Sequence, residues 1–324
     1  MSRPRVAVTR RIPDSALEML RAETDLWVSG EERPLTTEEL HAAVAGVDAA
    51  VTLLHDRVDD AFLDAAGDQL QVVANVAVGY DNIDVPAATR RGVIVTNTPG
   101  VLTDATADLA MALILAVTRR IAEGDRLVRA RVKWSWDMFF MLGASLQGKT
   151  LGVVGLGQIG SATARRARAF GMEIVYSGRR RADPEVEAEL GGARQLELNE
   201  LLASADVVTL HVPLSEATHH LIDAAKLDLM RESAYLVNTA RGPIVDEAAL
   251  AAALKAGTIA GAALDVFEHE PEVHPDLLEL DNVVLLPHLG SATVETRTAM
   301  AELAASNVLA VLAGEDPPTP VSAS

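Results

Sequence analysis

An arginine, a glutamate and a histidine late in the chain are of the types that could transfer a proton on an anionic substrate. Arg241, Glu270 and His288 each follow a short apolar segment typical of a buried strand. These segments are residues 234–238, 261–264 and 283–286. Ligands of open α/β sheets bind outside the carboxyl ends of the strands, so we expect the three side chains at one sheet edge. There the arginine would bind an anionic carbonyl compound, the histidine would move a proton, and the glutamate would orient the histidine.

Residue types alone leave this assignment open. Glu268 and His269 compete with Glu270, because all three stand in one short segment. The chain has eight histidines, and a single histidine is more often structural than catalytic. His211 also follows an apolar segment, where it could merely line a cofactor groove.

Three glycines, Gly155, Gly157 and Gly160, form a G-x-G-x-x-G motif between a predicted strand at 151–154 and an alanine-rich helix at 161–170. In dinucleotide-binding folds such glycines provide a tight turn, close approach of the backbone to a pyrophosphate, and close helix–strand packing. The helix N-terminus adds free N–H groups for phosphate. An ordinary tight turn is the alternative, but the flanking strand and helix favour dinucleotide binding. The motif also places Leu156, Gln158 and Ile159 against the cofactor.

The residues after the next predicted strand, 173–177, indicate which dinucleotide binds. NAD sites carry an acidic residue about 20 positions past the motif, but here that place is Gly178, followed by Arg179, Arg180 and Arg181. Arginine binds phosphate through two parallel hydrogen bonds, so the cluster favours the 2′-phosphate of NADP, with NAD possible. We expect Ser177, Arg179 and Arg180 to contact the cofactor. The alternative is a solvated basic turn.

Strand and helix patterns alternate through the whole chain and predict an α/β protein with parallel sheets. Five strands precede residue 100, and a capping box at Thr36 and Glu39 starts one of the helices between them. We also expect Asp14 to cap a helix, a long helix over 103–131, another over 293–312, and a loose tail at 316–320. The fold class is therefore two doubly wound parallel-sheet domains, Rossmann-like and flavodoxin-like, with a cleft between them.

Composition excludes several classes of function. A length of 324 residues suggests about two domains. The net charge of −18 argues against nucleic acid or an anionic membrane as a partner. Cysteine is absent, which excludes disulfides, a thiol nucleophile and zinc–thiolate sites, and we expect no metal centre. No signal peptide or bilayer-length apolar run is visible, so a cytoplasmic location is the simplest expectation.

Taken together, the motifs resemble the D-isomer-specific 2-hydroxyacid dehydrogenase family over nearly the whole chain. Within the family the sequence is most similar to glyoxylate/hydroxypyruvate reductases, particularly at 96–108 and 176–180. The stretches that carry the resemblance are 76–84, 96–108, 155–160, 238–242, 265–271 and 287–291.

The resemblance implies a role for each matching residue. His288 would donate the proton, Glu270 before Pro271 would be its partner, and Arg241 would hold the substrate carboxylate. The backbone N–H groups of Val78 and Gly79 would also bind that carboxylate, and Leu53 would border the pocket. Further residues would line the cofactor: Thr106, Pro213, Ala240, Asp265 and Gly290. Residues 1–100 with 289–324 would form the substrate-binding, flavodoxin-like domain, and residues 101–288 the dinucleotide-binding Rossmann domain.

The predicted function is therefore NADPH-dependent reduction of a small 2-keto acid, glyoxylate or hydroxypyruvate, to the 2-hydroxy acid. The enzyme alternative is another dehydrogenase of the family. Formate dehydrogenases would carry glutamine in place of Glu270, and 3-phosphoglycerate dehydrogenases often carry an extra regulatory domain. The other alternative is a dinucleotide-sensing corepressor, which would keep the same three residues but add partner-binding segments that are not visible here.

A homodimer built around residues 103–143 is also predicted. The segment Leu109 to Val117 is apolar on every side of its helix and must be buried, and one domain face cannot easily cover it. Of 11 aromatic residues, four fall between Trp134 and Phe140, as expected of an interface. In the resembling reductases this segment reaches toward the partner's active site.

Overall fold

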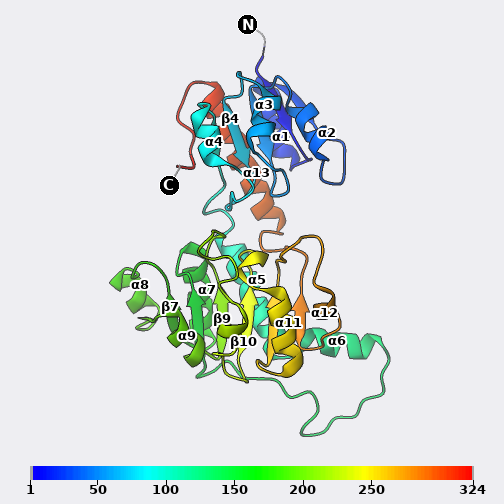
Figure 1. The fold of residues 1–324 in the computed structure, drawn as a ribbon, viewed down its shortest axis with the longest axis vertical. Coiled ribbons are helices and arrows are strands. Elements are labelled where there is room, and N and C mark those ends of the chain that lie inside the picture. Colours follow the sequence, from blue (N-terminus) through cyan, green and yellow to red (C-terminus); the bar gives the residue numbers. More distant parts are fainter. Residues whose placement is uncertain (1–2, 323–324) are drawn as a thin grey trace. The chain divides into compact units, whose positions relative to one another are not determined.

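The protein, described here by a computed structural model over residues 3–322, divides into two compact units (Figure 1). The first comprises Met1–Leu102 with Ser291–Ser324, and the second comprises Thr103–Gly290. Each unit is a parallel β-sheet with helices on both faces. The predicted α/β class with two parallel sheets is therefore confirmed.

The first unit contains a five-stranded sheet in the order β2-β1-β3-β4-β5. Its strands are β1 (Arg5–Val8), β2 (Asp25–Val28), β3 (Ala49–Thr52), β4 (Val72–Asn75) and β5 (Ile94–Thr96). Its helices are α1 (Asp14–Glu23), α2 (Thr37–Val44), α3 (Asp60–Ala66), α4 (Val85–Arg90) and α13 (Val294–Leu312).

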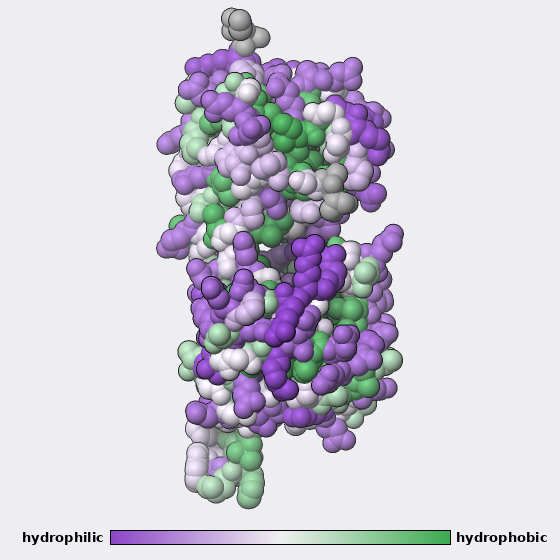
Figure 2. All heavy atoms as spheres, turned by 90° about the vertical axis from the view of Figure 1, so that its left-hand side faces the viewer, coloured by the Kyte–Doolittle hydropathy of each residue, from purple (hydrophilic) through white to green (hydrophobic). Residues whose placement is uncertain are grey.

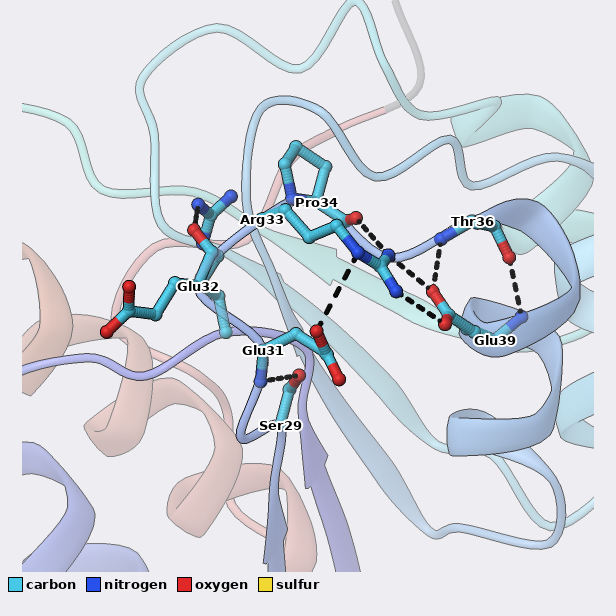
Figure 3. A network of polar contacts seen from close by, with 8 residues as sticks. Ser29, Glu31, Glu32, Arg33, Pro34, Thr36 and Glu39 are labelled. Atoms are coloured by element: carbon cyan, nitrogen blue, oxygen red, sulfur yellow. Dashed lines mark hydrogen bonds and ion pairs between the residues drawn. The ribbon is translucent and has the colours of Figure 1, made fainter.

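Alternate residues of these strands pack into two separate cores, as the period of two in a strand requires. Val6 and Val8 pack with α1 and α13, whereas Ala7 packs with α2, α3 and α4 on the opposite face. The capping box at the start of α2 is present: Thr36 accepts a hydrogen bond from the Glu39 N–H, and Glu39 accepts one from the Thr36 N–H (Figure 3). The Arg33 guanidinium donates two hydrogen bonds of 2.7 Å to the Glu39 carboxylate.

The second unit contains a seven-stranded sheet in the order β12-β11-β10-β9-β6-β7-β8. Its strands are β6 (Thr150–Val154), β7 (Glu173–Ser177), β8 (Arg194–Gln195), β9 (Val207–Leu210), β10 (Tyr235–Asn238), β11 (Gly261–Leu264) and β12 (Val283–Leu285). Its helices are α5 (Thr103–Thr118), α6 (Ile121–Arg129), α7 (Gln158–Ala169), α8 (Pro184–Glu189), α9 (Leu198–Ser204), α10 (Ala224–Leu227), the short 3₁₀ helix η1 (Gly242–Ile244), α11 (Glu247–Ala256) and α12 (Pro275–Leu278).

Three local predictions were wrong. Asp14 is the first residue of α1 and does not cap it, because Pro13 occupies the capping position. The helix expected over 103–131 is broken into α5 and α6, with Arg120 between them at a left-handed φ of 53°. The tail at 316–320 is held in place rather than loose, since Thr319 accepts a backbone bond from the Asn97 N–H and donates its own N–H to the Asn307 side chain.

The burial of α5 also differs from the expectation. Met111, Leu113, Ile114 and Val117 pack into a core with α7 and strands of the same unit. The unit therefore covers most of this helix by itself, and the helix no longer argues for a partner subunit. The reason is that α5 packs against α7 and also against β10, β11 and β12, so that both a helix and the sheet cover its sides.

The segment after α6 exposes its apolar side chains. Within it, Trp136 is 75% and Phe139 is 84% exposed, and Trp134 stacks on Phe140 with ring centroids 6.0 Å apart. In Figure 1 the segment runs as a long loop beyond the sheet and helices of its unit. Figure 2 shows a hydrophobic projection at the same end. Clustered exposed aromatic side chains are more typical of interaction sites than of surface in contact with water alone.

Candidate active site of the second unit

The carboxyl ends of the seven parallel strands of the second unit bring the predicted chemical residues to one edge. β6 pairs with β7 on one side and with β9 on the other, so the strand order reverses between β6 and β9. Ligands of such sheets bind at this switch point. The glycine turn (residues 155–160) follows β6, and the arginine loop (residues 178–182) follows β7. Arg241 follows β10, Glu270 follows β11 and His288 follows β12.

Each glycine of the turn has its own structural reason. Gly155 has a φ of 94°, and a Cβ there would lie 2.8 Å from the His211 carbonyl oxygen. A Cβ at Gly160 would lie 2.2 Å from the Gly155 carbonyl oxygen, so this glycine lets α7 pack closely on β6. At Gly157 a Cβ would meet none of the described residues within 4 Å, which leaves its backbone open to a ligand. No side chain caps α7, so its first N–H groups are available to an anion.

The arginine loop separates into two kinds of residue. Arg181 forms an ion pair of 2.8 Å with Glu187 of α8. Arg179 and Arg180 are exposed, and neither makes a hydrogen bond or ion pair with any residue from 3 to 322. These two guanidinium groups are therefore available to an anionic ligand beside the glycine turn. Ser177, the last residue of β7, accepts a 2.8 Å bond from the Gly155 N–H and joins the loop to that turn.

His288 and Glu270 form a hydrogen-bonded pair. Nδ1 of His288 lies 2.8 Å from Oε2 of Glu270, while Oε1 accepts a bond from the Phe267 N–H. Burial is the largest single effect and acts to raise the pKa of Glu270, but the bond and charge of His288, with smaller effects of the Phe267 bond and the Arg241 charge, together hold that pKa below its ordinary value. Glu270 is therefore ionised near neutral pH. Since Nδ1 is engaged, Nε2 is the ring nitrogen that remains for a substrate.

Glu268, the competing carboxylate, belongs to a different pair. Its Oε1 bonds Nε2 of His220, and its Oε2 accepts a 3.1 Å bond from the Glu247 N–H. Glu268 and Glu270 thus bond different histidines from one short segment. Of the carboxylates that the residue types left open, the structure places Glu270 against His288 and commits Glu268 elsewhere.

The backbone around Arg241 is fixed by Asn238 and Gly242. The Asn238 side chain donates a 2.9 Å bond to the Arg241 carbonyl oxygen and accepts a 3.0 Å bond from the Ala240 N–H. A Cβ at Gly242 would lie only 1.8 Å from the Phe267 carbonyl carbon, so glycine alone allows this loop to lie against the loop of Glu270. The charge of Arg241 also contributes to lowering the pKa of Glu270.

Asp265 holds the turn that carries His288. Its buried carboxylate accepts bonds of 2.6 Å from the Leu289 N–H and 2.8 Å from the Gly290 N–H. Burial raises the pKa of Asp265, against the effect of the Leu289 bond. His288 itself has a left-handed φ of 55°, a conformation that surrounding contacts must maintain. Thr106 of α5 bonds the Gly290 carbonyl oxygen at 3.1 Å and fixes the far side of the turn.

His211, the other histidine that follows a strand, cannot act as a proton donor at neutral pH. Burial lowers the pKa of His211 to about 4, so its ring is neutral, and Nε2 lies 3.0 Å from the Thr209 hydroxyl. Its backbone oxygen closes the glycine turn, as described above. Pro213, two residues further, is exposed, and its carbonyl oxygen accepts a 2.7 Å bond from the Thr218 hydroxyl.

In the first unit, a network of asparagines orders the backbone around Val78 and Gly79. Asn97 donates a 2.8 Å bond to the Val78 carbonyl oxygen, and Asn75 donates a 3.0 Å bond to that of Gly79. The N–H groups of Val78 and Gly79 have no hydrogen-bond acceptor among residues 3–322. Two adjacent N–H groups thus remain for an anion. Leu53 lies just after β3, where Asp56 accepts a 2.7 Å bond from its N–H.

Comparison with known proteins decides the family of this site. The family model described as "D-isomer specific 2-hydroxyacid dehydrogenase, NAD binding domain" matches residues 111–290. A glyoxylate reductase of Thermococcus kodakarensis is 51% identical over 325 residues, which cover 99% of this chain and 96% of that protein. The chain belongs to the D-isomer-specific 2-hydroxyacid dehydrogenase family.

Solved structures agree with this membership. A protein of Thermus thermophilus is 45% identical with a TM-score of 0.90, over 98% of this chain and 100% of that one. An NADPH-dependent glyoxylate/hydroxypyruvate reductase of Sinorhizobium meliloti, solved with NADP and malonate, is 37% identical with a TM-score of 0.86, over 99% of this chain and 97% of that one. This dehydrogenase is thus an NAD(P)-dependent oxidoreductase for small keto or hydroxy acids. Within residues 3–322, no helix is both long and apolar enough to cross a membrane.

Several residues that organise the site of the dehydrogenase were not singled out from the sequence. Asn238 holds the Arg241 loop, and Asn75 and Asn97 hold the carbonyls beside the free N–H groups. The available signal was an asparagine at or just after the end of a strand, a position where amide side chains often bond nearby backbone. Glu187, which engages Arg181, gave no such signal because it lies in a short acidic helix.

Proposed function

We propose that this dehydrogenase reduces a short 2-keto acid, glyoxylate or hydroxypyruvate, with NADPH as the preferred cofactor. The observation that carries the proposal is the pair of His288 and Glu270 beside Arg241, at the edge of the sheet that also carries the glycine turn. The names of the relatives support the substrate class, since the similar proteins of Thermococcus kodakarensis and Sinorhizobium meliloti are called glyoxylate and glyoxylate/hydroxypyruvate reductases.

The residues of the glycine turn fit a dinucleotide. Gly157 leaves its backbone open, and α7 offers uncapped N–H groups to the pyrophosphate. Arg179 and Arg180 make no hydrogen bond or ion pair with residues 3–322, and Gly178 stands where an acidic residue would repel a 2′-phosphate. Both features favour NADPH, with NADH as the poorer cofactor. When bound, the nicotinamide supplies a hydride. Further cofactor contacts are proposed for Leu156, Gln158, Ile159, Ser177, Thr106, Pro213, Ala240, Asp265 and Gly290.

His288 is proposed as the proton donor to the keto oxygen. The engaged Nδ1 fixes the orientation of the ring, and Nε2 is then the atom that gives its proton to the substrate. The ionised carboxylate of Glu270 stabilises the positive charge that the ring carries before this transfer. His211, which follows β9, is not suited to this role, because burial keeps its ring neutral at neutral pH.

Arg241 is proposed to hold the substrate carboxylate and to stabilise negative charge on the carbonyl oxygen. The unpartnered N–H groups of Val78 and Gly79 support their predicted share in binding the carboxylate. Leu53 is proposed to border the pocket and to favour a short side chain on the substrate. In this assignment Val78, Gly79 and Leu53 of the first unit contribute to binding the keto acid, and the second unit binds the cofactor and supplies Arg241 and His288.

The proposed assembly is a homodimer formed through the exposed segment that contains Trp134 and Trp136. Its support is the exposure of large aromatic side chains, which water solvates poorly and which a partner subunit would cover. A cytoplasmic location stays a prediction of the sequence.

The proposal is tested by initial rates with a panel of 2-keto acids and both cofactors. We expect kcat/KM with NADPH to exceed that with NADH, and glyoxylate or hydroxypyruvate to react faster than phenylpyruvate. Gly178→Asp combined with Arg179→Ala should move the preference toward NADH. Equal use of the two cofactors would contradict the NADPH assignment, and faster turnover of phenylpyruvate would contradict the substrate assignment.

A further inference from the structure

The loop that carries Arg179 and Arg180 is short and is fixed at both ends. At its start, the Gly178 carbonyl oxygen accepts a 2.8 Å bond from the side chain of Gln195. At its end, the Ala182 N–H donates a 2.9 Å bond to the hydroxyl of Tyr176. Figure 1 shows the loop joining β7 to α8 at one side of the second unit, and Figure 2 shows that this side is strongly hydrophilic.

Tyr176 is an unusual residue to find at this position. It lies in β7 and its side chain is fully buried, yet its hydroxyl bonds two groups outside the strand. Besides accepting from Ala182, the hydroxyl donates a 2.5 Å bond to Oε1 of Glu187 in α8. A buried hydroxyl with both bonds made holds its neighbours in one arrangement, since losing it would leave buried polar groups unpaired.

Glu187 extends this arrangement to the loop itself. Its carboxylate also accepts two bonds from Arg181, 3.0 Å from Nε and 2.8 Å from a terminal nitrogen. The Arg181 bond, followed by the Tyr176 bond, lowers the pKa of Glu187 to about 2, so the carboxylate stays charged at any physiological pH. The Arg181 side chain is 71% exposed, so its ion pair by itself contributes little, and the buried tyrosine bond is the anchor.

We infer that Tyr176, Glu187 and Arg181 form a clamp that positions Arg179 and Arg180 for the 2′-phosphate of NADPH and withholds Arg181 from it. Arg181 is thus a positioning residue and not a phosphate ligand, although it stands in the same run of three arginines. Tyr176 and Glu187 determine cofactor specificity without touching the cofactor. This inference rests on the proposed NADPH preference and adds the residues that produce it.

The test measures kcat/KM with NADPH and with NADH and compares their ratio between variants. Tyr176→Phe removes only the buried hydroxyl, and Glu187→Ala removes the shared carboxylate. Each should lower the ratio by about 3- to 10-fold, the loss expected from one or two hydrogen bonds, with kcat/KM for NADH little changed. Glu189→Ala is the matched control, because Glu189 ends the same helix in an ion pair with Arg165 outside the clamp and should leave the ratio unchanged.

A double-mutant cycle separates positioning from direct binding by Arg181. If Arg181 acts through Glu187, then Arg181→Ala lowers the ratio by no more than Glu187→Ala does, and the double variant is no worse than Glu187→Ala alone. If Arg181 bound the phosphate directly, Arg181→Ala would lower the ratio while Glu187→Ala, which frees the arginine, would maintain or raise it. That second pattern overturns the inference.

Different results would contradict the NADPH preference and the clamp. A wild-type enzyme without NADPH preference, or an Arg179→Ala/Arg180→Ala variant that keeps the preference, would contradict the proposed cofactor. A wild type that prefers NADPH through Arg179 and Arg180, with Tyr176→Phe and Glu187→Ala both at the wild-type ratio, would contradict the clamp alone. Thermal melting of each variant identifies a loss of folding, which would lower kcat/KM for both cofactors together and leave their ratio in place.

Discussion

Replacing Glu270 by glutamine tests the proposed catalytic pair most directly. The substitution keeps the size of the side chain and an oxygen that can accept the bond from the Phe267 N–H. It removes the negative charge 2.8 Å from Nδ1 of His288. The ring would keep its place, but a positively charged ring would lose its counter-ion.

The size of the effect follows from the bond that changes. A hydrogen bond to a charged group contributes about 1.5–3 kcal/mol, and the two side chains are 29% and 21% exposed, so solvent screens them only in part. At about 1.4 kcal/mol for each factor of ten, kcat should fall roughly 10- to 100-fold. Cofactor affinity should be unchanged, because Glu270 is not part of the glycine turn.

The assay is steady-state kinetics with glyoxylate, with cofactor affinity measured by fluorescence titration. Glu268→Gln is the matched control, because that carboxylate bonds His220 instead. A Glu270→Gln variant with kcat within threefold of the wild type would refute the proposed role of the pair.

His288→Ala should lower kcat about 10²- to 10⁴-fold while NADPH still binds, and a near-native kcat would assign the proton donor elsewhere. Arg241→Ala should raise KM for the keto acid and lower kcat. Unchanged KM and kcat would show that Arg241 does not bind the substrate carboxylate. Light scattering after size exclusion should show a dimer. If the aromatic segment completes the partner's site, mixing the Trp134→Ala/Trp136→Ala variant with the His288→Ala variant should restore activity. A stable, active 34.3 kDa monomer would contradict both predictions. Finally, the folded-state pKa of His211, about 4, lies below the ordinary value of 6.5, so stability should fall as pH drops from about 6.5 to 4, by at most about 3 kcal/mol. Urea unfolding of the wild type and of His211→Asn at pH 7 and 4.5 checks this. If both proteins lose the same free energy of unfolding between the two pH values, groups other than His211 cause the loss.

The features that the sequence determined by itself depend on neighbouring residues only. The glycine turn could be predicted because φ of 94° at Gly155 and the open backbone at Gly157 are properties that only glycine supplies. The capping box of Thr36 and Glu39 closes within four residues, and the apolar runs of the parallel strands need no partner to be visible. Because these strands end where the predicted residues begin, the sequence also placed Arg241, Glu270 and His288 on one sheet edge.

The tertiary structure decided what depends on residues far apart in the chain. Glu268 and Glu270 have the same chemistry, and only the positions of His220 and His288 assign each carboxylate its histidine. Likewise, three consecutive arginines are equivalent as letters, but Glu187 of α8 engages Arg181 alone. The apolar surface of α5 suggested a subunit partner until the fold supplied α7 and the sheet to cover it. In each case a side chain's role is set by a long-range contact, and local patterns carry no information about which contact forms.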